Sequence, residues 1–113
     1  MKKFMVIYHA PVEATEQMAN ASPDQMKEGM KPWMEWAQKC GDQLFDLGTP
    51  LAGGQKVLPN GKTEKSKRNV CGYSILEANN IEEAKSLLTG HPHLKWRSDC
   101  EIEIHETMPL PMS

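Results

Sequence analysis

The side chains best suited to acid–base chemistry gather in the last quarter of the sequence. His91 and His93 flank Pro92, and Glu103 and His105 follow after a short interval. Imidazole changes its charge near neutral pH, and a neighbouring carboxylate can orient it. This density of titratable groups predicts a polar site, with His91, His93 and Glu103 as its catalytic candidates.

Three interpretations of the histidine pair remain open. Following the helix stop at Gly90, the imidazoles could cap carbonyls at a helix end and serve structure alone. They could instead act as general acid or base in a pocket. A third possibility is a metal site completed by Glu103 or His105. Because this spacing supplies no dependable third ligand and Pro92 stiffens the pair, we predict neither a bound metal nor a cofactor.

Apolar patterns predict the four strands that would position these groups. Residues 4–8 and 69–77 are apolar on both alternating phases, which is typical of strands covered on both faces. Residues 100–106 alternate strictly, as a half-buried strand does. Residues 49–58 are interrupted by Gly53 and Gly54, which predicts a weak strand at a sheet edge.

Two helices are predicted between the strands. The first runs over residues 23–47 after the capping residue Ser22, with a kink near Pro32. The second begins after Asn80 and ends at Gly90. The segments 12–21 and 62–68 are predicted to be loops. The apolar stripe of the first helix, expected in the core, is Met26, Met30, Trp33, Ala37, Cys40 and Leu44.

The order strand, helix, strand, strand, helix, strand is that of an α+β, ferredoxin-like split βαβ domain (βαββαβ). It predicts a four-stranded antiparallel sheet with two helices on one face, since each crossover is right-handed. The second face would then be bare, although two strands are apolar on both phases. We therefore expect a homodimer joined through its sheets.

In such a sheet the last strand lies beside the first. Tyr8, His9 and His105 are therefore ligand-binding candidates, and Trp33 is expected to supply an apolar wall. The prediction is one pocket per subunit, shared with His91, His93 and Glu103 and opening towards the dimer partner. It would hold an unknown small molecule. A non-catalytic ligand-binding dimer and a structural or regulatory dimer are the alternatives.

Length and composition exclude other classes of protein. With 113 residues, 39% of them hydrophobic, the chain is sufficient for one domain, residues 1–113, of which 107–113 form an extended tail. A net charge of −2 and the lack of a recognition motif argue against nucleic acid. No apolar run approaches the roughly 20 residues of a membrane span. We expect a cytoplasmic protein with three free thiols, Cys40, Cys71 and Cys100.

Three segments resemble the YCII-related (YciI-like) family: the strand at residues 4–8, the helical stretch 30–36 and the strand at residues 100–105. The resemblance extends over about residues 3–109. It implies the dimeric α/β-barrel group, which includes small cofactor-independent monooxygenases. Some members use a histidine on the first helix and an aspartate before a proline. Here the first helix has no histidine and His91 precedes the proline, so that dyad is not carried over.

Overall fold

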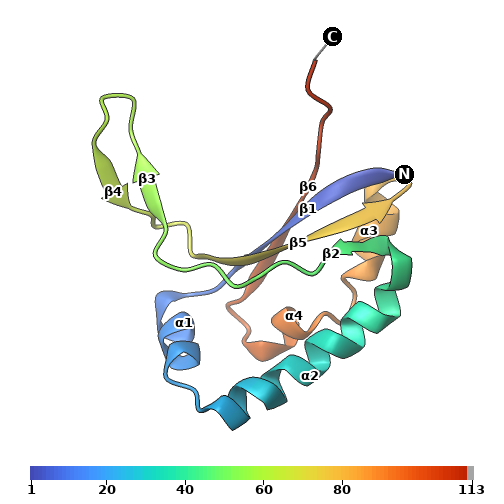
Figure 1. The fold of residues 1–113 in the computed structure, drawn as a ribbon, viewed down its shortest axis with the longest axis horizontal. Helices are drawn as coiled ribbons and strands as arrows, with labels where there is room; N and C mark the ends of the chain where they lie inside the picture. The colour runs from blue at the N-terminus through green and yellow to red at the C-terminus, as the bar shows by residue number, and fades with distance from the viewer. Residues whose placement is uncertain (112–113) are drawn as a thin grey trace.

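The strand β1 (Lys2–His9) lies at the centre of a four-stranded antiparallel sheet in the computed structural model, which describes residues 1–111. The strand order is β2-β5-β1-β6, and β3 and β4 form a separate hairpin (Figure 1). The other elements are α1 (Val12–Ala19), α2 (Pro23–Cys40), the 3-10 turn η1 (Gly41–Gln43), β2 (Leu44–Asp46), β3 (Gln55–Val57), β4 (Thr63–Lys65), β5 (Val70–Ala78), α3 (Ile81–Leu87), α4 (Pro92–Trp96) and β6 (Glu101–Glu106).

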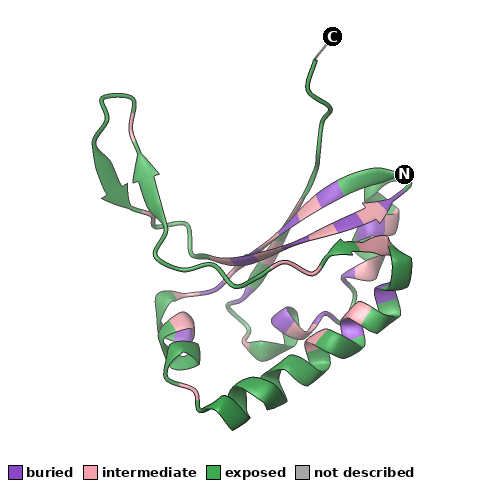
Figure 2. Ribbon diagram, viewed as in Figure 1, coloured by how far each residue is buried: buried purple, intermediate pink, exposed green. Residues whose placement is uncertain are grey.

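Alternation along β1 gives the sheet two different faces. Phe4, Val6 and Tyr8 are buried at 0–3% exposure, whereas Met5 and Ile7 on the opposite phase are only partly buried. Burial follows the strand face and the inner sides of the helices (Figure 2). One core cluster unites the buried phase of the sheet with α2 and α3: Phe4, Val6, Tyr8, Trp36, Cys40, Leu76, Ala78, Ala84 and Leu88.

The other face of the sheet, the open face, is covered by no helix of the described residues (Figure 1). Met5 lies opposite Ile75 and Ile7 lies opposite Tyr73 in the antiparallel register, so these four side chains form adjacent cross-strand pairs. All four are partly exposed. An apolar sheet face of this kind is a common location for a partner.

The α+β class, the antiparallel sheet and both helix starts are confirmed. Ser22 and Gln25 form a reciprocal capping box, and Asn80 accepts from the backbone N–H of Glu83. Pro32 lies inside a single helix, as expected.

The predicted extent of the first helix was wrong. It ends at Cys40 because Gly41 adopts a positive φ of 59°, and Leu44 then begins an edge strand beside Leu76. The predicted buried stripe was also wrong in its first half. Met26 and Met30 are 50% and 46% exposed, because this end of α2 extends beyond the sheet (Figure 2).

Three further segments differ from prediction. Residues 12–21 were predicted as a loop but contain α1, which is held by burial of Ala14 against Ala10 and Cys100. Residues 49–58 do not form the edge strand, since only Pro50 bridges to Gly72. Their last part joins residues 63–65, predicted as loop, in the β3–β4 hairpin.

Beyond β6, the tail has no regular structure as far as residue 111, and residues 112 and 113 lie outside the described residues. No helix within residues 1–111 is long and apolar enough to cross a membrane.

Candidate functional site

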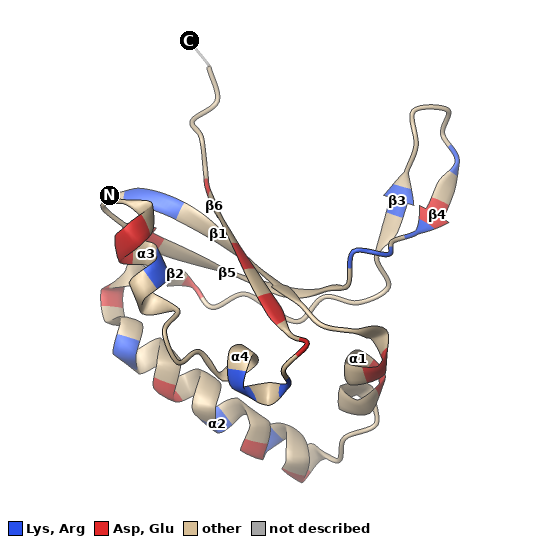
Figure 3. Cartoon of the chain, turned by 180° about the vertical axis from the view of Figure 1, so that it is seen from behind, with Lys and Arg blue, Asp and Glu red and all other residues tan. Residues whose placement is uncertain are grey.

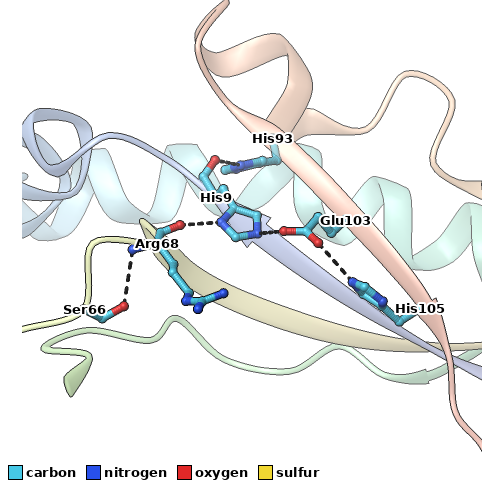
Figure 4. Close-up of polar contacts among 6 residues, drawn as sticks. All are labelled: His9, Ser66, Arg68, His93, Glu103 and His105. Atoms are coloured by element: carbon cyan, nitrogen blue, oxygen red, sulfur yellow. Dashed lines mark hydrogen bonds and ion pairs between the residues drawn. The ribbon is translucent and has the colours of Figure 1, made fainter. Parts of the chain in front are cut away.

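The structure divides the predicted site residues between the two faces of the sheet. Tyr8, His91 and His93 lie on the helix side, in the core. His9, Glu103 and His105 lie on the open face (Figure 4). The predicted pocket combined His91, His93 and Glu103 with Tyr8 or His9, and the structure does not bring the two histidines and Glu103 to the same face of the sheet. Successive residues of a strand point to opposite faces, so Tyr8 and His9 cannot line the same cavity.

On the helix side, His91 is completely buried in an aromatic cluster. Its ring centroid lies 4.3 Å from that of Trp36 and 4.7 Å from that of Trp33. Trp33, predicted as a pocket wall, also packs edge-on against Tyr8 at 5.0 Å. These rings fill the space between α2 and the sheet, so Trp33 is a wall of the core here.

A directional hydrogen-bond chain runs through this cluster. The backbone N–H of His93 donates to Nδ1 of His91 at 3.0 Å, so the neutral ring carries its proton on Nε2. That N–H then donates to Tyr8 Oη at 3.2 Å, the Tyr8 hydroxyl donates to Ser74 Oγ at 2.7 Å, and Ser74 donates to the Leu47 carbonyl at 2.6 Å. Each hydrogen has one acceptor, so the chain is satisfied without a ligand.

Burial makes these groups poor acids and bases. Desolvation lowers the pKa of His91 to about 3, and repulsion from His93 adds to the effect. Burial also lowers the pKa of His93, partly offset by hydrogen bonds to backbone groups of His9 and Glu101. Desolvation raises the pKa of Tyr8 above its usual range. His91 caps the start of α4 rather than the end of the preceding helix.

On the open face, Glu103 lies between two histidines (Figure 4). Its Oε1 is 2.5 Å from Nε2 of His9, and its Oε2 is 3.0 Å from Nε2 of His105. The contact with His9 is short, but it lies outside hydrogen-bond angles. Nδ1 of His9 donates to the Arg68 carbonyl at 2.7 Å. The two ring nitrogens of His9 therefore face the Arg68 carbonyl and the Glu103 carboxylate.

His105 has a different role available to it. Its Nε2–H donates to Glu103, which leaves Nδ1 as the lone-pair nitrogen of the neutral ring. The hydrogen bond from His105 lowers the pKa of Glu103, and the charge of His9 adds to this, so the carboxylate remains ionised. A carboxylate that holds one imidazole nitrogen and leaves the other free is the arrangement of an oriented general base.

A cavity of about 370 Å³ opens beside this group, lined by His9, Arg68, Glu101 and Glu103. Its size is in the range of small-molecule sites, about 300–1,000 Å³. It adjoins the apolar pair of Ile7 and Tyr73, since Ile7 lies opposite Glu103 in the sheet. The four residues that line the cavity are all polar or charged, and the apolar pair lies beside them in the sheet.

Two residues of these networks were missed from the sequence. Arg68 lies in a charged run that was interpreted as solvated loop, and Ser74 lies in a strand that was interpreted as apolar. Only Ser74 could have been found from the sequence, because it is a polar residue within the buried phase of β5. A buried hydroxyl requires a partner, so its position could have indicated the network.

Cysteine chemistry is not favoured at either site. Burial raises the pKa of Cys71 to about 11, with Cys100 contributing, and it also raises the pKa values of Cys40 and Cys100. Thiols of this kind are protonated and unreactive at neutral pH. Within the described part of the chain, no group of three or more His, Cys, Asp or Glu side chains is arranged to hold a metal ion.

Sequence comparisons do not assign the chain to a family: neither a protein-family model nor a curated protein matches it. The resemblance to YCII-related proteins therefore stays a prediction.

Proposed function

We propose that this protein is a homodimeric small-molecule-binding domain with an acid–base site on its open sheet face, built on the ferredoxin-like βαββαβ plan. The strand order β2-β5-β1-β6 supports that plan, with α2 and α3 as its two crossover helices on one face. On this proposal α1, α4 and the β3–β4 hairpin are additions to it. The same plan is consistent with the YCII-like resemblance and with a dimeric α/β barrel.

The proposed dimer places two open faces against each other. Met5, Ile7, Tyr73 and Ile75 would then be buried between two sheets, where their apolar surface contributes about 25 cal/mol per Å² removed from water. The cavity beside His9 would become enclosed. Enclosure lowers the local dielectric and strengthens the interaction of Glu103 with its histidines.

The observation that carries the proposal is Glu103 bridging His9 and His105 at the edge of this cavity. His105 is the general base in this scheme, Glu103 orients it, and the ion pair with His9 fixes Glu103. The supported reaction class is proton abstraction from a small molecule without a cofactor. His91 and His93, the initial catalytic candidates, are assigned to the core because both ring nitrogens of His91 and Nε2 of His93 are hydrogen-bonded to protein groups.

A fragment screen by protein-observed NMR tests this assignment. Small polar aromatic fragments should perturb the amide signals of Ile7 and Tyr73 in the native protein. Binding should weaken at least tenfold in both His105→Gln and Glu103→Gln, because each variant breaks the pair. Glu106→Gln is the matched control, since Glu106 lies at the end of the same strand and makes only a 3.7 Å ion pair with Lys2.

Fragments that bind the native protein and His105→Gln equally well would contradict the role of His105. A native dimer with no fragment site on its open face would favour the structural alternative. In that case the His9–Glu103 pair serves only to join strands.

A further inference from the structure

The β3–β4 hairpin extends from the body as an arm of opposite charge. The basic arm, residues 55–68, contains five Lys or Arg side chains and one acidic residue, for a formal charge of +4. The remaining chain has eight Lys or Arg and 14 Asp or Glu, for a charge of −6. Figure 3 shows mostly basic residues on the arm, whereas the body has acidic residues on α1, α2, α3 and β6, interspersed with basic residues on β1, α2 and α4. The total of −2 conceals this segregation.

The arm has almost no packing of its own. Within residues 1–111, β3 and β4 pair with each other and with no other strand. Every residue of the arm is exposed except Leu58 and Ser66, which are partly exposed, and Val57 is 72% exposed. An isolated two-stranded hairpin is at best marginally stable in water, and packing against another surface is what stabilises it. The described part of the chain therefore offers the arm no surface to pack against.

The direction of the arm indicates on which side of the molecule a stabilising surface would lie. The arm and the C-terminal tail both project away from the helices, on the side of the open face (Figure 1). A body placed on the open face would lie between them. The base of the arm also belongs to the candidate site, because the Arg68 carbonyl accepts from His9 and Arg68 lines the cavity.

We propose that the basic arm docks on the acidic surface of a second copy of this chain, and that this contact holds Arg68 at the cavity. The inference rests on the proposed dimer, which supplies the second copy. Charge complementarity selects the occupant: the body of the partner has a formal charge of −6 and the arm +4, so their attraction favours the pairing. In a two-fold dimer each copy gives one arm and receives one.

The test compares the dimer dissociation constant of the native chain with that of two charge-matched variants. The arm variant is Lys62→Gln, Lys65→Gln and Lys67→Gln, three exposed lysines without an ion pair among the described residues. The control, Lys27→Gln, Lys39→Gln and Lys95→Gln, changes the net charge equally at exposed helical positions. Sedimentation equilibrium at about 0.1 M salt, where the Debye length is about 10 Å, gives each constant.

We expect the dissociation constant of the arm variant to rise at least tenfold, while the control remains within about twofold of the native value, because the attraction is local to the arm. Raising the salt to about 1 M, where the Debye length is about 3 Å, should remove the difference. Hydrogen exchange of the amides of residues 55–65 should slow when the native chain dimerises.

Different failures have different meanings. A native chain that is monomeric throughout would overturn the proposed dimer together with this contact. A dimer whose arm variant associates like the native chain, with arm amides still exchanging freely, would overturn the arm contact alone. Binding of a fluorescein-labelled DNA duplex by the native chain but not the arm variant, with dimerisation unchanged, would overturn it in favour of a nucleic-acid partner.

Discussion

At the scale of single residues, the protein uses its histidines in two different ways. His91 is neutral, completely buried and bonded through both ring nitrogens to protein groups. His105 is exposed, and only its Nε2 has a partner among residues 1–111. Desolvation opposes the charged form of the His91 imidazole, so that this ring stays neutral in the core.

The buried histidine makes stability depend on pH. Because the pKa of His91 falls from 6.5 to about 3 on folding, the unfolded chain binds the extra proton between these two values. Stability is therefore fully present above pH 6.5 and is lost as pH falls towards 3, by up to about 1.4 kcal/mol per pH unit for one group. Urea unfolding at several pH values and one fixed protein concentration measures this slope.

The variant His91→Gln isolates that contribution. A glutamine amide can accept from the His93 N–H and donate to Tyr8, but it does not titrate in this range. We expect the slope below pH 6.5 to be shallower in His91→Gln than in the native chain. Equal slopes in the two proteins would show that His91 is not the group responsible.

At the scale of elements, the loop from β2 to the arm depends on one close approach. Gly48 has a φ of +78°, and a Cβ at this position would lie 1.8 Å from the carbonyl oxygen of Tyr73. Backbone cannot move away as a flexible side chain can. The loop therefore passes close over β5 only because this residue has no side chain.

Gly48→Ala should destabilise the protein by about 2–4 kcal/mol, through both the positive φ and the backbone overlap. Gly29→Ala is the matched control: Gly29 lies inside α2, and nothing lies within 4 Å of its added Cβ. That change should stabilise the helix by about 0.5–1 kcal/mol. Chemical denaturation of both variants measures the change in the free energy of unfolding. A Gly48→Ala variant as stable as the native chain would contradict the close approach.

At the scale of the whole molecule, the two faces of the sheet are covered differently. The helix face is completed by the chain itself, whereas the open face presents apolar cross-strand pairs to its surroundings. On the proposed function, a second copy supplies what is missing. Stability would then depend on protein concentration as well as on the fold of one chain.

A charge placed on the open face tests this arrangement. Ile75→Lys should raise the dimer dissociation constant at least about a hundredfold, because an unpaired buried charge costs about 3–5 kcal/mol. The monomer should keep its circular dichroism spectrum, since Ile75 does not belong to the helix-side core. Val12→Lys, at a position 56% exposed on α1, is the control and should associate normally. Light scattering that finds Ile75→Lys still dimeric would contradict the proposed interface.

The sequence by itself determined the local elements. Residues 4–8 and 69–77 were identified as strands because they are short runs that are apolar on both phases, and residues 100–106 because polar and apolar side chains alternate at the strand period. Ser22 and Asn80 were identified as caps because a cap is a contact within one turn. Such signals are complete within a few neighbouring residues.

Only the tertiary structure decided which face each residue joins. Both phases of β1 are apolar, so the sequence could not show that Tyr8 faces the helices and His9 the open side. It likewise placed Met26 in the core, whereas Trp36 is the buried residue, because burial depends on how far a helix overlaps the sheet. Arg68 lines the cavity because the chain returns from the β3–β4 hairpin to the sheet at this point, which the sequence did not show. Periodicity defines the faces of an element, but the layer that covers each face is set by contacts between distant parts of the chain.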